Sequence, residues 1–381
     1  DALAARGARF EIAYAASSNT PQSLAALLTG HSAPGSGASL ASAFAAAGYA
    51  THAVTADASL EGSGELARGF ATWTGDLASS QLARHASSRL AVTLAAMGLW
   101  RPPEAPPSAA LVVDEALARA DASGPPFFLL LHMMDASDPY TPAPNVARGE
   151  GGGDPPAPMR ARELAEMMEG RHRAEPQDLE RLRSLYAGSV TSIDAEIGRL
   201  VRGLESRGLS DRTIVAVTSD HGEEFIEHGG LGHDDTLYEE LVRVPLVIAG
   251  PAVTPGLVLK GPVRAIDVAP TLAEAAAVKP DGPFDGASAW GAIARGEPLT
   301  QRQVLLEMTY VGARHPFHLF RSVRSGDEKV IGSTFHVDGA GPWRWELYDL
   351  SADPLEKHDL AAARPGILME VRSMGERERA K

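Results

Sequence analysis

The sequence predicts an α/β fold that ends in a small antiparallel sheet. The chain has 381 residues, which is enough for one large domain and a smaller appended unit. Up to about residue 300, apolar runs of strand length alternate with segments of helical periodicity. After that point, short strand patterns follow one another without helices between them. We therefore expect an α/β domain over residues 1–300 and a small α+β subdomain over residues 301–381.

Composition and charge exclude several classes of protein. Hydrophobic residues make up 44% of the chain and charged residues 22%, and no run approaches the roughly 18–20 apolar residues of a membrane span. The net charge of -14 argues against a nucleic-acid partner, because a phosphate backbone needs a basic surface. The chain has no cysteine, so any metal must be held by oxygen and imidazole ligands.

The N-terminal segment combines three signals of a short helix. Thr20 precedes Pro21 and an apolar run, and Gly30 follows that run. A hydroxyl residue at the N-cap, proline at the first helical position and glycine just past the end are typical of such a helix. We therefore expect Thr20 to be the N-cap, after the end of a helix at residues 1–5 and a strand at residues 9–15.

The remaining elements follow from apolar periodicity. A long amphipathic helix is expected from residue 177 to Gly208, because apolar residues recur there every three or four positions. Residues 142–158, rich in proline and glycine, should lack regular structure. The other expected helices span residues 40–47, 79–97, 108–122 and 269–277, with a last one near the end of the chain. The expected strands span residues 50–56, 126–132, 214–217, 246–249, 304–308, 319–324, 329–331 and 345–348.

Acidic and imidazole side chains stand where two predicted strands end. Asp220 and His221 follow residues 214–217, while His132 and Asp135 close or follow residues 126–132. Ligands of open α/β sheets bind beyond the carboxyl ends of the strands. Carboxylate and imidazole groups suit a divalent cation there. Alternatively, Asp220 caps the following turn and His221 packs against it.

Residues 214–225, together with 232–240 and 242–246, resemble the sulfatase family of the alkaline phosphatase superfamily. Further segments of similarity follow in the family's order, at residues 20–30, 193–200, 267–272, 285–286 and 346–350. The resemblance implies an alkaline phosphatase-like, three-layer α/β/α sandwich with a mostly parallel central sheet. It also implies a metal-dependent hydrolase of sulfate or phosphate esters.

The resemblance carries specific roles onto four residues. Asp220 and His221 match the family's metal ligands, so they would hold one divalent cation, which could be Ca, Mn, Mg or Zn. Thr20 stands at the nucleophile position and would also contact the cation. His233 would stabilise charge on the ester or protonate the leaving group.

Three departures from the family pattern bear on the chemistry. Thr20 stands where the family has a cysteine or serine matured to formylglycine, and Leu24 stands where it has an arginine. Ser137 replaces a histidine that contacts substrate in related members. Formylglycine chemistry is therefore not expected, and threonine favours phosphate esters. His132 and His228 fit structural roles better than catalytic ones.

Residues 1–7 resemble the remainder of a helix that follows the family's first strand, so upstream sequence with further acidic ligands is expected. The alternatives to hydrolysis are a membrane-anchored headgroup transferase of the phosphoethanolamine or phosphoglycerol type and a catalytically silent binding module. The expected partner is a small-molecule, glycan or lipid ester, with membrane association only through upstream sequence. The resemblance favours a periplasmic, secreted or membrane-anchored location.

Overall fold

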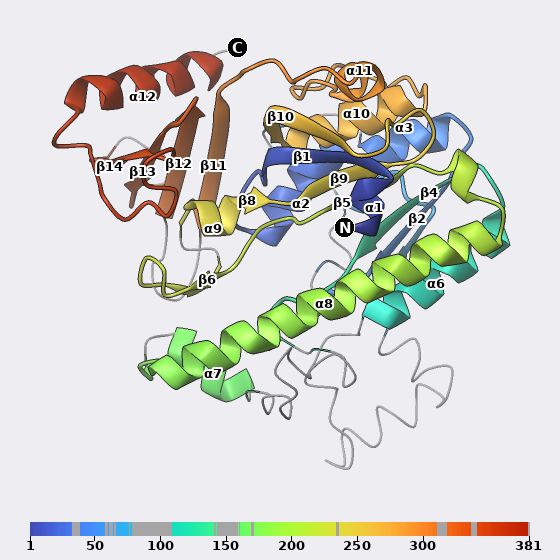
Figure 1. The fold of residues 1–381 in the computed structure, drawn as a ribbon, viewed down its shortest axis with the longest axis horizontal. Coiled ribbons are helices and arrows are strands. Elements are labelled where there is room, and N and C mark those ends of the chain that lie inside the picture. The colour runs from blue at the N-terminus through green and yellow to red at the C-terminus, as the bar shows by residue number, and fades with distance from the viewer. Residues whose placement is uncertain are drawn as a thin grey trace. The chain divides into compact units, whose positions relative to one another are not determined.

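The computed structural model describes residues 1–32, 39–57, 60, 64, 66–75, 77, 109–140, 142, 159, 161–168, 171–233, 236–310, 318–336 and 341–379 (Figure 1). The chain divides into two compact units, one of residues 1–40 with 211–381 and the other of residues 41–210. The boundary between two domains at residue 300, which the sequence predicts, stays a prediction. The helix expected at residues 79–97 and nearly all of the loop expected at 142–158 lie outside the described residues.

The central sheet of the first unit is mixed. It has the order β10-β1-β9-β5, and β8 also pairs with β1. Strand β1 runs parallel to β10 and antiparallel to β8 and β9, and β5 runs antiparallel to β9. The strands span Gly7–Tyr14 (β1), Val215–Thr218 (β5), Arg243–Val244 (β8), Leu246–Ala249 (β9) and Leu257–Arg264 (β10).

The mixed direction corrects the prediction of a mostly parallel sheet. Thr218, the last residue of β5, pairs with Leu246, the first residue of β9. The connection between them therefore begins and ends at the same end of the sheet, whereas a parallel pair needs a crossover to the opposite end. This connection contains the hairpin of β6 (Glu224–Phe225) and β7 (Leu231–Gly232) and the short helix α9 (Glu239–Val242). The predicted three-layer arrangement stays a prediction.

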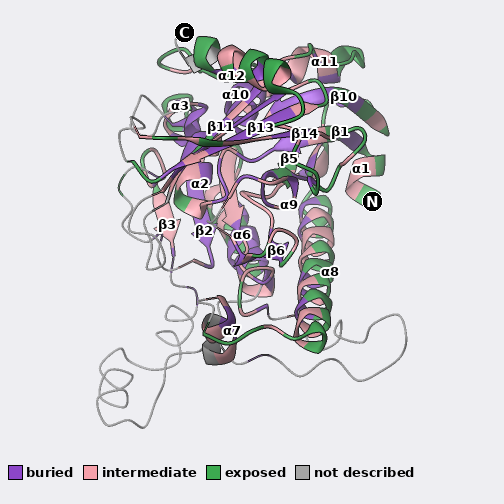
Figure 2. Cartoon of the chain, turned by 90° about the vertical axis from the view of Figure 1, so that its left-hand side faces the viewer, coloured by how far each residue is buried: buried purple, intermediate pink, exposed green. Residues whose placement is uncertain are grey.

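Apolar side chains of this sheet form the core of the first unit. Strand β1 is the centre of it, and Figure 2 shows the buried residues along β1 and β10. The core cluster includes Phe10, Ile248, Leu259, Val263 and Ile293. The helices of this region are α1 (Ala2–Ala5), α2 (Thr20–Thr29), α10 (Val268–Ala275) and α11 (Trp290–Arg295), with 3-10 turns at Ser210–Arg212 and Ala265–Asp267.

The C-terminal residues form the four-stranded antiparallel sheet that the sequence predicted. Strands β11 (Val304–Tyr310), β12 (His318–Ser325), β13 (Glu328–Thr334) and β14 (Arg344–Asp349) pair in chain order, and α12 (Pro365–Arg379) follows. Val323, Val330 and Leu347 of the sheet pack with Val371 of α12. Residues of β11 and β12 pack instead with Tyr14 of β1 and Leu241 of α9. The small sheet therefore packs against α12 and also against Tyr14 of β1 and helix α9.

The second unit contains a parallel three-stranded sheet of order β3-β2-β4. Its elements are α3 (Leu40–Ala46, whose first residue belongs to the other unit), β2 (Ala50–Thr55), β3 (Thr72–Thr74), α6 (Ala109–Ser123), β4 (Phe127–His132), α7 (Ala161–Met168) and α8 (Pro176–Ser206). Arg199 of α8 bonds to Asp114 of α6 at 2.6 Å, and Arg207, which follows α8, bonds to Asp121 at 2.6 Å. The long helix is thus held along α6.

Among the helices in the described part of the chain, none combines the length and the apolar character required to cross a lipid bilayer.

A buried ion network joins the small sheet to the central one. Lys329 of β13 is fully buried, and its Nζ lies 2.9 Å from Oε1 of Glu239 and 3.0 Å from Oε1 of Glu356. The Tyr14 hydroxyl donates to Glu239 at 2.8 Å, and Arg324 donates to that hydroxyl. Burial opposes ionisation of Glu239, but the charge and hydrogen bond of Lys329, the hydrogen bond from Tyr14 and the charge of Arg324 together outweigh it and lower the pKa of Glu239. Burial raises the pKa of Glu356.

Replacing Lys329 with methionine should destabilise the protein by about 3–5 kcal/mol, because two buried carboxyl groups would lose their shared cation. Urea unfolding would measure the change. Lys260→Met is the matched control, since Lys260 is exposed on β10 and its loss should change stability by less than about 0.5 kcal/mol. Equal stability of the two variants would contradict the role of the network.

Candidate functional site

Helix α2 places Thr20 at its first residue, and Asn19 is the N-cap. The Oδ1 atom of Asn19 accepts a hydrogen bond from the backbone N–H of Gln22 at 3.3 Å. The prediction that Thr20 caps the helix is therefore wrong by one residue, because asparagine is at least as good an N-cap as threonine. The Thr20 side chain instead meets His221, with 2.9 Å between Oγ1 and Nε2.

The loop after β5 supplies Asp220 and His221. The Nδ1 atom of His221 is 2.8 Å from the carbonyl oxygen of Gly222. A carbonyl can only accept a hydrogen bond, so Nδ1 carries the proton and Nε2 presents its lone pair toward Thr20. The same Nε2 lies 3.6 Å from Oδ2 of Asp220, and these two side chains are 10% and 15% exposed. Carboxylate, imidazole and hydroxyl therefore converge at one partly buried point.

Close backbone packing holds this loop against α9. The N–H of Gly222 donates to the carbonyl of Leu241 at 2.7 Å, and that of Glu223 donates to Glu240 at 3.1 Å. A Cβ atom on Gly222 would lie 1.9 Å from the carbonyl oxygen of Glu240. Only glycine permits this approach, which explains its place directly after His221.

Ser23 joins the helix of Thr20 to the loop of Asp220. Its hydroxyl donates to the backbone carbonyl of Asp220 at 2.5 Å, and its side chain is fully buried. The sequence reasoning missed Ser23. The available signal was a hydroxyl residue one helical turn after Thr20 within an apolar run.

His233 follows the second strand of the β6–β7 hairpin. Its ring centroid lies 4.2 Å from that of His221, with an angle of 31° between the ring planes. The structure thus brings Thr20, Asp220, His221 and His233 together within one unit. Their chemical roles stay predictions.

The donors present fit the divalent cation that the sequence resemblance implies. A carboxylate, a neutral imidazole nitrogen and a hydroxyl are available from Asp220, His221 and Thr20. Oxygen and imidazole ligands are accepted by Zn and Mn, and with more oxygen ligands by Mg and Ca. This set does not select one of these metals.

The second pair expected from the sequence lies in the other unit, at the end of β4. The Nδ1 atom of His132 is 3.1 Å from the Thr55 hydroxyl of the neighbouring strand. Asp135 is 2% exposed, and burial raises its pKa. The N–H of Ser137 donates to the Met134 carbonyl in the turn that follows. A part for these residues in the site stays a prediction.

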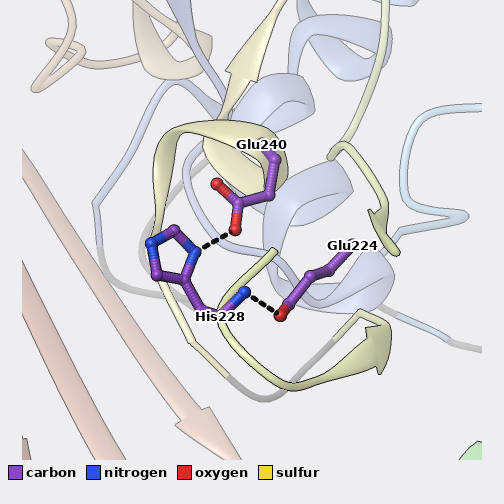
Figure 3. Close-up of side chains that lie close together, drawn as sticks. All are labelled: Glu224, His228 and Glu240. Atoms are coloured by element: carbon purple, nitrogen blue, oxygen red, sulfur yellow. Dashed lines mark hydrogen bonds and ion pairs between the residues drawn. The ribbon is translucent and has the colours of Figure 1, made fainter. Parts of the chain in front are cut away.

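A further group of potential metal ligands, Glu224, His228 and Glu240, lies in the segment that carries His233 (Figure 3). Glu224 accepts hydrogen bonds from the backbone N–H groups of His228 and Gly230. The His228 ring faces Glu240 through Nδ1, at 2.5 Å, and the Glu356 carbonyl through Nε2, at 3.0 Å. Both ring nitrogens are therefore engaged by oxygen atoms, and this geometry suits a side chain that orders the loop.

Two family models and several curated relatives match this chain. The sulfatase family model matches residues 1–278, and the model of the C-terminal region of N-sulphoglucosamine sulphohydrolase matches residues 227–371. The choline-sulfatase of Rhizobium meliloti is 32% identical over 191 residues, which cover 49% of this chain and 34% of that protein. The N-acetylglucosamine-6-O-sulfatase of Bacteroides thetaiotaomicron is 32% identical over 179 residues, which cover 46% of this chain and 31% of the relative. These matches span about a third of each relative's length.

Solved structures share the fold along nearly the whole chain. The structure of BT4656 with its substrate D-glucosamine-2-N,6-O-disulfate has a TM-score of 0.75 at 20% identity, covering 100% of this chain and 92% of that one. The phosphonate monoester hydrolase of Agrobacterium radiobacter has a TM-score of 0.70 at 20% identity, covering 99% and 90%. The family model covers most of the chain, and both the mixed sheet and the four-stranded C-terminal sheet accord with it. The chain therefore belongs to the sulfatase family, within the alkaline phosphatase superfamily.

Proposed function

We propose that this sulfatase-family chain hydrolyses phosphate or sulfate esters with Thr20 as its nucleophile and with a divalent cation at Asp220 and His221. The contact of 2.9 Å between Thr20 Oγ1 and His221 Nε2, beside the Asp220 carboxylate, carries the proposal. It supports a cation site in which a hydroxyl is one of the donors. Members of this family typically bind such an ion, and the relatives matched include sulfatases and a phosphonate monoester hydrolase.

Each residue has a distinct task in this proposal. A cation held by Asp220, His221 and Thr20 would lower the pKa of the Thr20 hydroxyl and neutralise charge on the ester. The Thr20 hydroxyl gives up its proton to solvent, Oγ1 attacks the phosphorus or sulfur atom, and the bond to the leaving alcohol breaks. His233, beside His221, supplies the proton that the departing oxygen needs. Water then cleaves the Thr20 ester and restores the hydroxyl.

The surroundings of Thr20 favour phosphate over sulfate chemistry. Threonine cannot be matured to formylglycine in the way that cysteine or serine can. Leu24, at the position of the family's arginine, is only 5% exposed. The helix also offers few backbone donors, since Pro21 has no N–H and those of Gln22 and Ser23 donate to Asn19. The backbone donors of this turn are thus largely engaged, so the cation would have to bind the anionic ester.

The Thr20→Ala variant should lose ester hydrolysis by at least about 10³-fold in kcat/KM, because the attacking oxygen is removed. Hydrolysis of aryl phosphate, phosphonate and sulfate esters would be measured with Mn, Zn, Ca or Mg and with a chelator. Thr191→Ala is the matched control, since Thr191 is exposed on α8. Activity that is indifferent to both Thr20→Ala and the chelator would rule out this mechanism. A wild-type chain inactive on every ester would favour a silent family member.

Gly222→Ala should weaken both the fold and hydrolysis. The added methyl group would meet the Glu240 carbonyl, so the loop of Asp220 and His221 must move, at a cost of about 1–3 kcal/mol. Urea unfolding would measure stability, and hydrolysis would be assayed at a temperature where the variant is folded. Gly282→Ala is the control, because no atom lies within 4 Å of a Cβ added there. Wild-type behaviour of Gly222→Ala would show that the close approach is unimportant.

A further inference from the structure

The first turn of α2 is attached to the C-terminal sheet through Gln22. The Gln22 Nε2 donates to the Thr309 carbonyl of β11 at 2.7 Å, and the Thr309 N–H donates back to Gln22 Oε1 at 3.3 Å. A carboxamide presents one donor and one acceptor side by side, as a backbone amide does. The side chain therefore pairs with β11 on the edge opposite β12, like one residue of a further strand.

A second contact ties the residues before Thr20 to the same strand. The Ser18 hydroxyl lies 2.9 Å from Sδ of Met308 and 2.8 Å from the carbonyl oxygen of Thr236. Ser18 is fully buried. Strand β11 thus holds the chain two residues before Thr20 and two residues after it.

Helix α2 is also held by the loop that carries the predicted cation ligands, Asp220 and His221. Ser23 donates to the Asp220 carbonyl, and the backbone N–H of Ala15 donates to Val242 at 2.8 Å. Thr20 itself has no capping duty, because Asn19 caps the helix. The distance between Thr20 Oγ1 and His221 Nε2 is therefore set by the attachments of the residues around Thr20.

We propose that Gln22 is a positioning residue, which pairs with Thr309 to fix the Thr20 hydroxyl against His221. The C-terminal sheet then contributes to the reaction without touching the ester. This inference rests on the proposed function for its catalytic consequence. The attachment itself has a separate physical readout, which is protection of the first turn of α2 from hydrogen exchange.

Gln22→Met tests the proposal, because methionine has a similar length and neither donates nor accepts a strong hydrogen bond. We expect kcat to fall by about 10–100-fold while KM changes by less than about threefold, since a small displacement of a nucleophile slows chemistry more than binding. Amide hydrogens in residues 17–24 should exchange about tenfold faster, because the two hydrogen bonds with Thr309 and the one from the Ser17 hydroxyl to Gln22 are lost. Gln177→Met, at an exposed residue of α8, should change none of these.

Gln22→Glu adds a measurement of kcat against pH. A purely structural role of Gln22 would not change the pH dependence of kcat alone. An ionised glutamate cannot donate to the Thr309 carbonyl, whereas its protonated form can. The ratio of kcat for Gln22→Glu to kcat for the wild type should therefore rise as the pH falls, at constant KM. For Gln22→Met the same ratio should stay constant with pH. This variant also serves as the test if Gln22→Met does not fold.

Two results would overturn the proposal. One is an unchanged kcat in a folded Gln22→Met variant, or in a folded Gln22→Glu variant at a pH where the glutamate is ionised, and the other is unchanged exchange in residues 17–24. Wild-type activity of Thr20→Ala would instead refute the proposed function, and exchange would then still decide whether Gln22 holds the turn. The two failures are thus distinguishable.

Discussion

The position of the site depends on the burial of one ammonium group, that of Lys329, between two carboxylates. Glu239 belongs to α9, and Glu356, which follows β14, also accepts the backbone N–H of Glu239 at 2.6 Å. Desolvation offsets much of the attraction in such a pair, so its main effect is to permit one arrangement of the sheet on α9. The carbonyls of the same helix bind Gly222 and Glu223, directly beyond His221. Helix α9 therefore takes part in the ion network through the Glu239 side chain and holds the loop of His221 through its backbone carbonyls.

The side chains with proposed chemical roles, such as His221 and Asp220, are held mainly through backbone atoms of neighbouring residues. His221 is oriented by the carbonyl of Gly222, and the loop of Asp220 is held by the hydroxyl of Ser23. Such supporting contacts restrict the movement of a reactive side chain, which would otherwise be free to change its rotamer.

Strong periodicity made part of the fold predictable. The helix expected at residues 177–208 is observed as Pro176–Ser206, and all four strands of the small sheet were found. Strand β10 was missed because Gly261 and Pro262 interrupt its apolar pattern; its pairing with β1 is irregular just there, between Phe10 and Ile12. The relative direction of the strands was mispredicted, because it depends on the end of the sheet to which each connection returns. Local sequence patterns do not contain that information. Asp220 and His221 were proposed from their position after a strand and from the family resemblance, and the roles of Thr20 and His233 from the resemblance; all four roles stay predictions. Ser23 and Gln22 were missed because they bond to backbone groups distant in sequence.

The residues in and next to the first turn of α2 also limit which positively charged groups can stabilise the ester during the reaction. It supplies a hydroxyl at Thr20, a neutral amide at Gln22 and a buried aliphatic side chain at Leu24. A guanidinium at that last position would need acceptors for its charge, because a buried unpaired charge is costly. Without it, negative charge developing on the ester would have to be stabilised by the cation and by the two neighbouring histidines, His221 and His233. We therefore expect catalysis by this chain to depend more strongly on its cation than catalysis by relatives that keep the arginine.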